Sequence, residues 1–163
     1  MKPLKEWIVP WLYTSREYNV GILDQAWAKP ENARLMLNEN PIPPSEKVIQ
    51  AVVDSMRSGN RYPDSFLRLR TKIGKMYGLG PDNVALCNGS SETIDTMMRV
   101  FLQPGDEFLL STPTFELFPP RAELCIGKVV QIPVREDDLQ YDVDAMLAAI
   151  NERTKLMLII NPN

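Results

Sequence analysis

The feature that most constrains the fold is an alternation of strand-like and helix-like segments over residues 84–163. Apolar segments typical of strands occupy residues 84–87, 107–110, 128–132 and 156–160, and helix-like segments separate them at about 91–102, 115–124 and 143–151. Asp142 stands at the N-cap position of the last helix-like segment, ahead of apolar residues at helical spacing. This alternation predicts right-handed βαβ crossovers, and therefore an α/β fold with a mostly parallel sheet.

Two further helices are predicted ahead of this alternation. One begins after Ser45 and ends near residue 58, and the other begins after Asp64 and ends at Gly78. Residues 34–37 have the composition of a short strand or extended segment, and the prolines of 38–44 predict irregular backbone. Residues 1–33 show no sustained period and are predicted to form an N-terminal arm. Its tryptophans need apolar cover, either from this chain or from a partner.

Composition limits the chemistry that is available to the chain. Without histidine, and with only Cys87 and Cys125 as thiols, it has no Ser-His-Asp or Cys-His pair and too few ligands for a zinc site. No P-loop signature is present, and a net charge of -3 gives no pull toward nucleic acid. The longest clean apolar run, residues 156–160, is too short to span a membrane, and we expect a cytoplasmic protein with reduced thiols. Reactive groups must come from a cofactor or from residues outside this chain.

The loops that follow three of the predicted strands should lie at one edge of the sheet, where open parallel sheets bind ligands. In the first of them, Asn88-Gly89-Ser90-Ser91-Glu92, a glycine allows a tight turn and two serines open a helix. Free amides and hydroxyls at a helix N-terminus form a phosphate-binding site. The alternative is a plain capping serine, and spacing alone leaves both interpretations open.

Three other features each allow a functional interpretation and a purely structural one. Phe115 follows a predicted strand, where an aromatic ring can stack on a planar ligand or simply enter the core. Tyr62 lies in a turn between two helices, where tyrosines are usually packing or surface residues. Six cations and one acid over residues 57–75 could attract a phosphorylated partner, but a solvated helix face explains them as well.

Several short motifs, in one order, carry a family resemblance over about residues 34–163. They are Leu37-Asn38-Glu39-Asn40-Pro41, Pro44-Ser45, Arg61-Tyr62-Pro63-Asp64, Leu69-Arg70, Asn88-Gly89-Ser90-Ser91-Glu92, Pro104-Gly105-Asp106, Pro113-Thr114-Phe115, Thr154-Lys155 and Asn161-Pro162-Asn163. Together they resemble the first half of a fold-type I aminotransferase that depends on pyridoxal phosphate. The histidinol-phosphate aminotransferase group is the most similar.

The resemblance implies a domain organisation and a cofactor site. Residues 34–163 would be an incomplete cofactor-binding (large) domain, with the start of the small domain and a linker at about 34–60, preceded by the 1–33 arm. The groups around Gly89, Ser90 and Ser91 would hold the cofactor phosphate, and Phe115, often tyrosine in the family, would stack on the pyridine ring. Tyr62 would reach the neighbouring subunit's cofactor phosphate across a homodimer, and the arm would pack on that subunit.

The activity implied is transamination, in which the cofactor ring accepts electrons while an amino group is exchanged. By resemblance the substrates are an amino acid or amino alcohol phosphate, here histidinol phosphate, and a keto acid, with 2-oxoglutarate and glutamate as the second pair, in histidine biosynthesis. The covalent cofactor lysine, the acid on the ring nitrogen and the substrate arginine follow the matched motifs in the family. We therefore assign no catalytic residue and no metal ligand here, and we expect a truncated chain that does not transaminate alone.

Other interpretations of the same residues stay open. Threonine-phosphate decarboxylase and aromatic-amino-acid aminotransferase share the early motifs, and the residues that discriminate them lie largely past Asn163. A non-catalytic phosphate-binding or dimerisation module would use the half-sheet as it stands. A further possibility is that the segment is only the part that was expressed, in which case the last strand lacks its normal neighbours.

Overall fold

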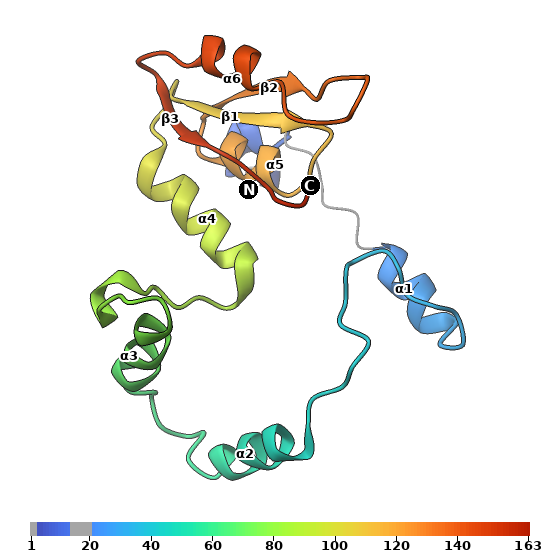
Figure 1. Cartoon of the computed structure of the whole chain (residues 1–163), viewed down its shortest axis with the longest axis vertical. Coiled ribbons are helices and arrows are strands. Elements are labelled where there is room, and N and C mark those ends of the chain that lie inside the picture. The colour runs from blue at the N-terminus through green and yellow to red at the C-terminus, as the bar shows by residue number, and fades with distance from the viewer. Residues whose placement is uncertain (1–2, 14–20) are drawn as a thin grey trace. The chain divides into compact units, whose positions relative to one another are not determined.

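Figure 1 shows the protein as a computed structural model that describes residues 3–13 and 21–163. The described residues divide into two units, one made of residues 3–13 and 87–163 and the other of residues 21–86. The first contains the 3-10 helices η1 (Leu4–Glu6) and η2 (Pro10–Tyr13) and the sheet. Within this unit η2 lies against α5 (Phe118–Leu124), so part of the predicted arm covers its own chain.

The described residues of the first unit form a three-stranded parallel sheet in the order β2-β1-β3. Its strands are β1 (Glu107–Thr112), β2 (Lys128–Pro133) and β3 (Thr154–Met157). The chain leaves β1 for β2 through α5 and returns past β1 to β3 through α6 (Val143–Ala149), and these helices lie on opposite faces (Figure 1). The predicted α/β fold with parallel βαβ units is confirmed, and β1 is the strand at which the strand order reverses.

The core of this unit lies between β1 and α4 (Gly89–Phe101). Buried apolar side chains form one cluster made of Met98, Leu102, Phe108, Leu110 and Ala122. β1 is buried over most of its length because sheet neighbours flank it on both sides, which explains its continuous apolar run. A short connection, residues 102–106, leads from α4 to the start of β1 (Figure 1).

A buried carboxylate joins the amino-terminal ends of the three strands. Glu107, at the start of β1, is 6% exposed. Its Oε1 accepts from Lys128 Nζ at 2.9 Å, and its Oε2 accepts from Asn151 Nδ2 at 2.7 Å. Donation by Lys128, and then by Asn151, lowers the pKa of Glu107 below its ordinary value of 4.5.

This ion pair predicts a loss of stability in acid. Because the pKa of Glu107 is lowered in the folded state, its contribution is present above the unfolded-state pKa and is lost as pH falls through the folded-state pKa. The measurement is the urea midpoint of unfolding at a series of pH values between neutral pH and pH about 3. At pH values below the unfolded-state pKa, this midpoint should fall less steeply with pH in Glu107→Gln than in the parent chain. Equal slopes would mean that this carboxylate has the same pKa in both states.

The second unit is helical in its described residues. It contains α1 (Gly21–Ala28), α2 (Glu46–Met56), α3 (Leu67–Met76) and the 3-10 helix η3 (Pro81–Asn83). Arg70 ties α3 to the following chain, because its Nε donates to the carbonyls of Pro81 and Val84 at 3.0 Å each and it pairs with Asp82. Apolar side chains repeat at every fourth position of α2, and Val48, Val52 and Met56 are each more than half exposed in this structure.

Two predicted strands and two predicted helix starts differ from the structure. Residues 84–87 form no strand, and the carbonyl of Val84 accepts from Arg70 Nε instead. The strand expected at 156–160 lies at Thr154–Met157, although the Leu158 amide still donates to Leu109 O. α3 begins at Leu67 because Asp64 accepts from the Phe66 amide, and α5 begins at Phe118 where proline follows. The N-cap at Asp142 is confirmed, since its side chain accepts from the Ala145 amide.

Three observations concern the composition of the described residues. Cys87 and Cys125 are free thiols. No cluster of three or more acidic or thiol side chains suited to a metal is found in residues 3–13 and 21–163. None of the helices within the same described ranges has the length and apolarity that crossing a membrane requires.

Candidate functional site

The first turn of α4 carries the predicted phosphate-binding residues. Gly89 has a φ of +77° with no atom near the position of a Cβ, so the chain turns into the helix through a conformation that favours glycine. Its amide donates to Cys87 O at 2.9 Å. Glu92 turns back and accepts from the Asn88 backbone amide and from Asn88 Nδ2. Ser90 and Ser91 follow Gly89 in the first turn and are exposed.

This first turn leaves donors available to a ligand. Among the described residues, no side chain caps α4 and no carbonyl accepts from the amides of Ser90 and Ser91. Those amides and the two serine hydroxyls belong to the first turn, at the positive end of the helix dipole. The carboxylate of Glu92 is already engaged by Asn88. The donor set of this turn therefore fits an anion such as a phosphate, and the loop geometry that the sequence predicted is present.

Phe115 lies in the loop that follows β1. Its ring is 44% exposed and meets the Phe118 ring edge-on, with centroids 5.9 Å apart and an interplanar angle of 83°. Phe118 in turn packs on Phe108, with centroids 6.3 Å apart. A chain of rings thus connects the buried core to Phe115, at the carboxyl end of β1.

The loop after β1 and the segment after β3 are joined by side-chain hydrogen bonds. Asn163 Oδ1 accepts from Thr114 Oγ1 at 2.8 Å, and Asn163 Nδ2 donates to Pro113 O at 3.0 Å. Tyr141 holds the same segment, because its hydroxyl donates to Ile160 O at 2.6 Å and accepts from the Ile160 amide at 2.9 Å. These bonds form at the carboxyl edge of the sheet, beside the strand at which the strand order reverses, where open α/β sheets bind ligands.

The structure therefore brings only part of the predicted set into one unit. Gly89, Ser90, Ser91 and Phe115 belong to the unit that contains the sheet, the first three in the first turn of α4 and Phe115 in the loop after β1. Tyr62 belongs to the unit of residues 21–86 and is fully exposed. Its predicted reach to a neighbouring subunit stays a prediction.

Residue-by-residue interpretation missed the roles of Tyr141, Thr114 and Asn163 in holding this edge together. Their partners are up to 50 positions away in the sequence, so no local pattern marks the pairs. The one available signal was that Thr114 and Asn163 both lie in loops expected after strands of the same sheet.

Comparison with known proteins identifies the family. The family model for aminotransferase class I and II matches residues 31–163. A histidinol-phosphate aminotransferase from Ruegeria pomeroyi is 35% identical over 130 residues, covering 79% of this chain and 36% of the relative. An aromatic amino acid aminotransferase from Streptomyces avermitilis is 34% identical over 139 residues, covering 85% of this chain and 38% of the relative. The chain thus spans a little over a third of the length of these relatives.

Solved structures agree on the fold. An aspartate aminotransferase from Thermotoga maritima matches with a TM-score of 0.81 and 23% identity, covering 96% of this chain and 46% of that one. A histidinol-phosphate aminotransferase from Sinorhizobium meliloti, solved in complex with pyridoxal-5'-phosphate, matches with a TM-score of 0.74 and 20% identity, covering 90% and 39%. Because the family model matches residues 31–163, which is most of the chain, this chain belongs to the class I and II aminotransferase family.

Proposed function

We propose that this chain supplies the phosphate-binding and ring-stacking part of a pyridoxal-phosphate-dependent aminotransferase. The observation that carries the proposal is the first turn of α4, where the amides of Ser90 and Ser91 have no acceptor among the described residues. When bound, pyridoxal phosphate supplies an electron-accepting ring. Gly89, Ser90 and Ser91 hold its phosphate, and Phe115 supports its ring.

Histidinol phosphate, with 2-oxoglutarate and glutamate as the second pair, is the proposed substrate of the protein to which this chain contributes. Relatives named for that activity, such as the one from Ruegeria pomeroyi, support it. The aromatic amino acid aminotransferase from Streptomyces avermitilis, at 34% identity, supports aromatic amino acids as the alternative. A homodimer that uses Tyr62 across its interface, a place in histidine biosynthesis and a cytoplasmic location are further predictions from the family resemblance.

Cofactor binding by the 163-residue chain tests the phosphate site. We expect the chain to retain pyridoxal phosphate in ultrafiltration and to retain pyridoxal, which lacks the phosphate, far less. Replacing Ser90 and Ser91 together with alanine removes two hydroxyl donors to a charged group, and each such bond is worth about 1.5–3 kcal/mol. The double variant should therefore bind pyridoxal phosphate at least about tenfold more weakly.

The control for this experiment is Ser65→Ala, which removes an exposed serine from the other unit. It should leave retention unchanged. Equal retention of pyridoxal and pyridoxal phosphate, or the same loss in Ser65→Ala as in the double variant, would overturn the assignment of the phosphate site.

The substrate is tested on the protein produced from its own gene. Glutamate release is measured with 2-oxoglutarate and, in turn, histidinol phosphate and phenylalanine as amino donors. The proposal expects the higher kcat/KM with histidinol phosphate. A preference for phenylalanine would transfer the assignment to the aromatic alternative without affecting the cofactor site.

A further inference from the structure

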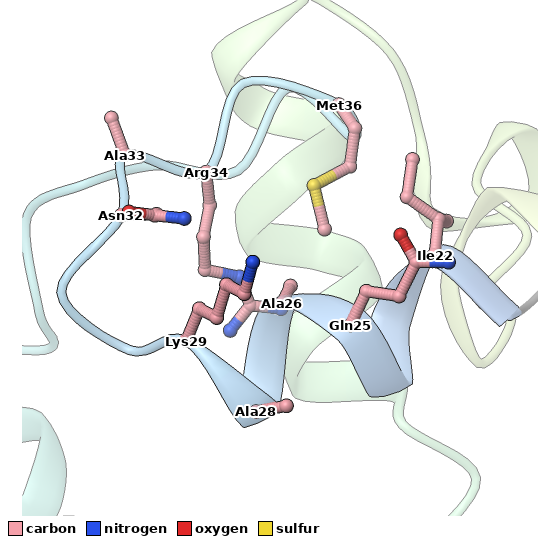
Figure 2. A pocket seen from close by; sticks show the side chains of 9 residues that line it. All are labelled: Ile22, Gln25, Ala26, Ala28, Lys29, Asn32, Ala33, Arg34 and Met36. Atoms are coloured by element: carbon pink, nitrogen blue, oxygen red, sulfur yellow. The ribbon is translucent and has the colours of Figure 1, made fainter.

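A cavity of about 450 Å³ lies within the unit of residues 21–86, between α1 and the chain that follows it. Its size falls in the range of small-molecule sites. None of its described lining residues belongs to the proposed cofactor site. Figure 2 shows Lys29, Asn32 and Arg34 gathered at one end of the cavity, with Ile22 and Met36 at the other. The cavity therefore has a cationic end and an apolar end.

Arg34 is held in place at the cationic end. Its guanidinium stacks over the Trp27 ring, 5.0 Å from the centroid, and its Nε lies 3.0 Å from Glu39 Oε2. The buried Nε has no hydrogen-bond partner within the described residues, so its contact with Glu39 is an ion pair that lacks hydrogen-bond geometry. A guanidinium offers five N–H donors, so Glu39 leaves this head group with unused capacity.

Charge at this end of the cavity is also unbalanced. The Lys29 side chain has no ion pair or hydrogen bond among the described residues, although its carbonyl accepts from the Asn32 amide, and the one ion pair of Arg34 within these residues is with Glu39. Asn32 adds an amide at the same end (Figure 2). Two cations therefore line this end of the cavity, and only Arg34 has a carboxylate partner within the described residues. A second anion would pair with Lys29 and with the N–H donors of Arg34 that Glu39 leaves unused.

We propose that this cavity binds a small carboxylate that carries a short apolar chain. The carboxylate accepts from Arg34 and Lys29, with Asn32 beside them, and the apolar chain lies against Ile22, Ala26 and Met36. A ligand without the negative charge leaves Lys29 without a partner of opposite charge, and a ligand without the apolar chain leaves the far end of the cavity unfilled. The site is independent of the proposed cofactor function, since it uses different residues.

Hexanoate is the probe for this site, and nuclear magnetic resonance of the labelled 163-residue chain is the measurement. The Arg34 Nε–H resonance, identified by its disappearance in Arg34→Lys, should shift saturably with hexanoate. Acetate should bind at least about tenfold more weakly because it lacks the chain that the apolar end covers. Hexylammonium, which has the same chain and the opposite charge, should produce no shift.

Variants decide whether the cations of the cavity are responsible. Lys29→Gln, which leaves the Arg34–Trp27 stack intact, should weaken hexanoate binding about tenfold, since it removes a charge-assisted bond. Lys47→Gln, an exposed site on α2, is the matched control and should bind like the parent. If Lys29→Gln changes the spectrum of the free chain as a whole, Asn32→Ala replaces it and should weaken binding. Equal affinity for acetate and hexanoate, a shift with hexylammonium, or equal losses in the Lys29 and Lys47 variants would overturn the proposal.

Discussion

Replacing Phe108 with alanine is expected to destabilise the sheet unit by about 3–5 kcal/mol, the range for large aromatic truncations in a packed core. Phe108 is 2% exposed and lies in the cluster with Met98, Leu102 and Leu110, so the removed ring leaves a cavity that its neighbours cannot fill without moving. A loss of this size is a large fraction of the 5–15 kcal/mol that ordinarily separates folded from unfolded protein. Hydrogen exchange of the β1 amides, measured as a function of urea concentration, reports this loss in the free energy of unfolding.

The matched control is Phe101→Ala, the same truncation on α4 at a side chain that is 48% exposed. It should cost no more than about 1 kcal/mol, because roughly half of the ring is already in water. Phe108 also supports Phe118, on which Phe115 rests, so the core truncation should weaken retention of pyridoxal phosphate as well. Similar losses from the two truncations would show that β1 is not the centre of the core.

Replacing Gly74 with alanine is expected to destabilise α3 by about 2 kcal/mol, although alanine is the better helix former. A Cβ at Gly74 would lie 2.7 Å from the Leu79 carbonyl oxygen and 3.1 Å from that of Gly80. These are backbone atoms that Arg70 helps to hold, since it bonds the chain that follows. Because backbone atoms must move, the steric cost should reach about 3 kcal/mol, the upper end of the usual range, against a gain of about 1 kcal/mol in helix propensity.

Gly80→Ala is the control for this prediction. A Cβ there meets only the Asn83 side chain, at 3.9 Å, and the residue's φ of -81° suits alanine. It should be neutral or slightly stabilising, because it reduces the freedom of the unfolded chain. Exchange protection of the α3 amides distinguishes the two variants, and a neutral Gly74→Ala would mean that the close approach of residues 79–80 to α3 is not maintained in solution.

Features whose partners are near in sequence could be predicted, and features with distant partners could not. Asp142 caps α6 by accepting from an amide three residues later, and Gly78 ends α3 with a φ of +68°. Both signals lie within one turn of helix. Residues 84–87, whose apolar pattern predicted a strand, form none, and the Val84 carbonyl accepts from Arg70, 14 positions earlier in the chain. The apolar pattern of the segment does not encode that partner.

The candidate site divides in the same way. The glycine and serines of α4 form a local motif, so their arrangement followed from the sequence once a helix was expected there. The bonds from Asn163 to Thr114 and from Tyr141 to Ile160 depend on the order of the strands, which brings distant segments to one edge. Glu107 is similar, because its burial becomes favourable only when Lys128 and Asn151 arrive from other elements.

The position of β1 between two strands that both follow it also bears on how the chain folds. Every pairing in this sheet is non-local, since β2 can join β1 only after α5 has crossed one face, and β3 only after α6 has crossed the other. The entropy of closing each loop is lost before the strand pairs form and stabilise the sheet. We therefore expect strand assembly, rather than helix formation, to limit the folding rate. The contacts of Tyr141 and Asn163 with the strand ends would then be among the last to form.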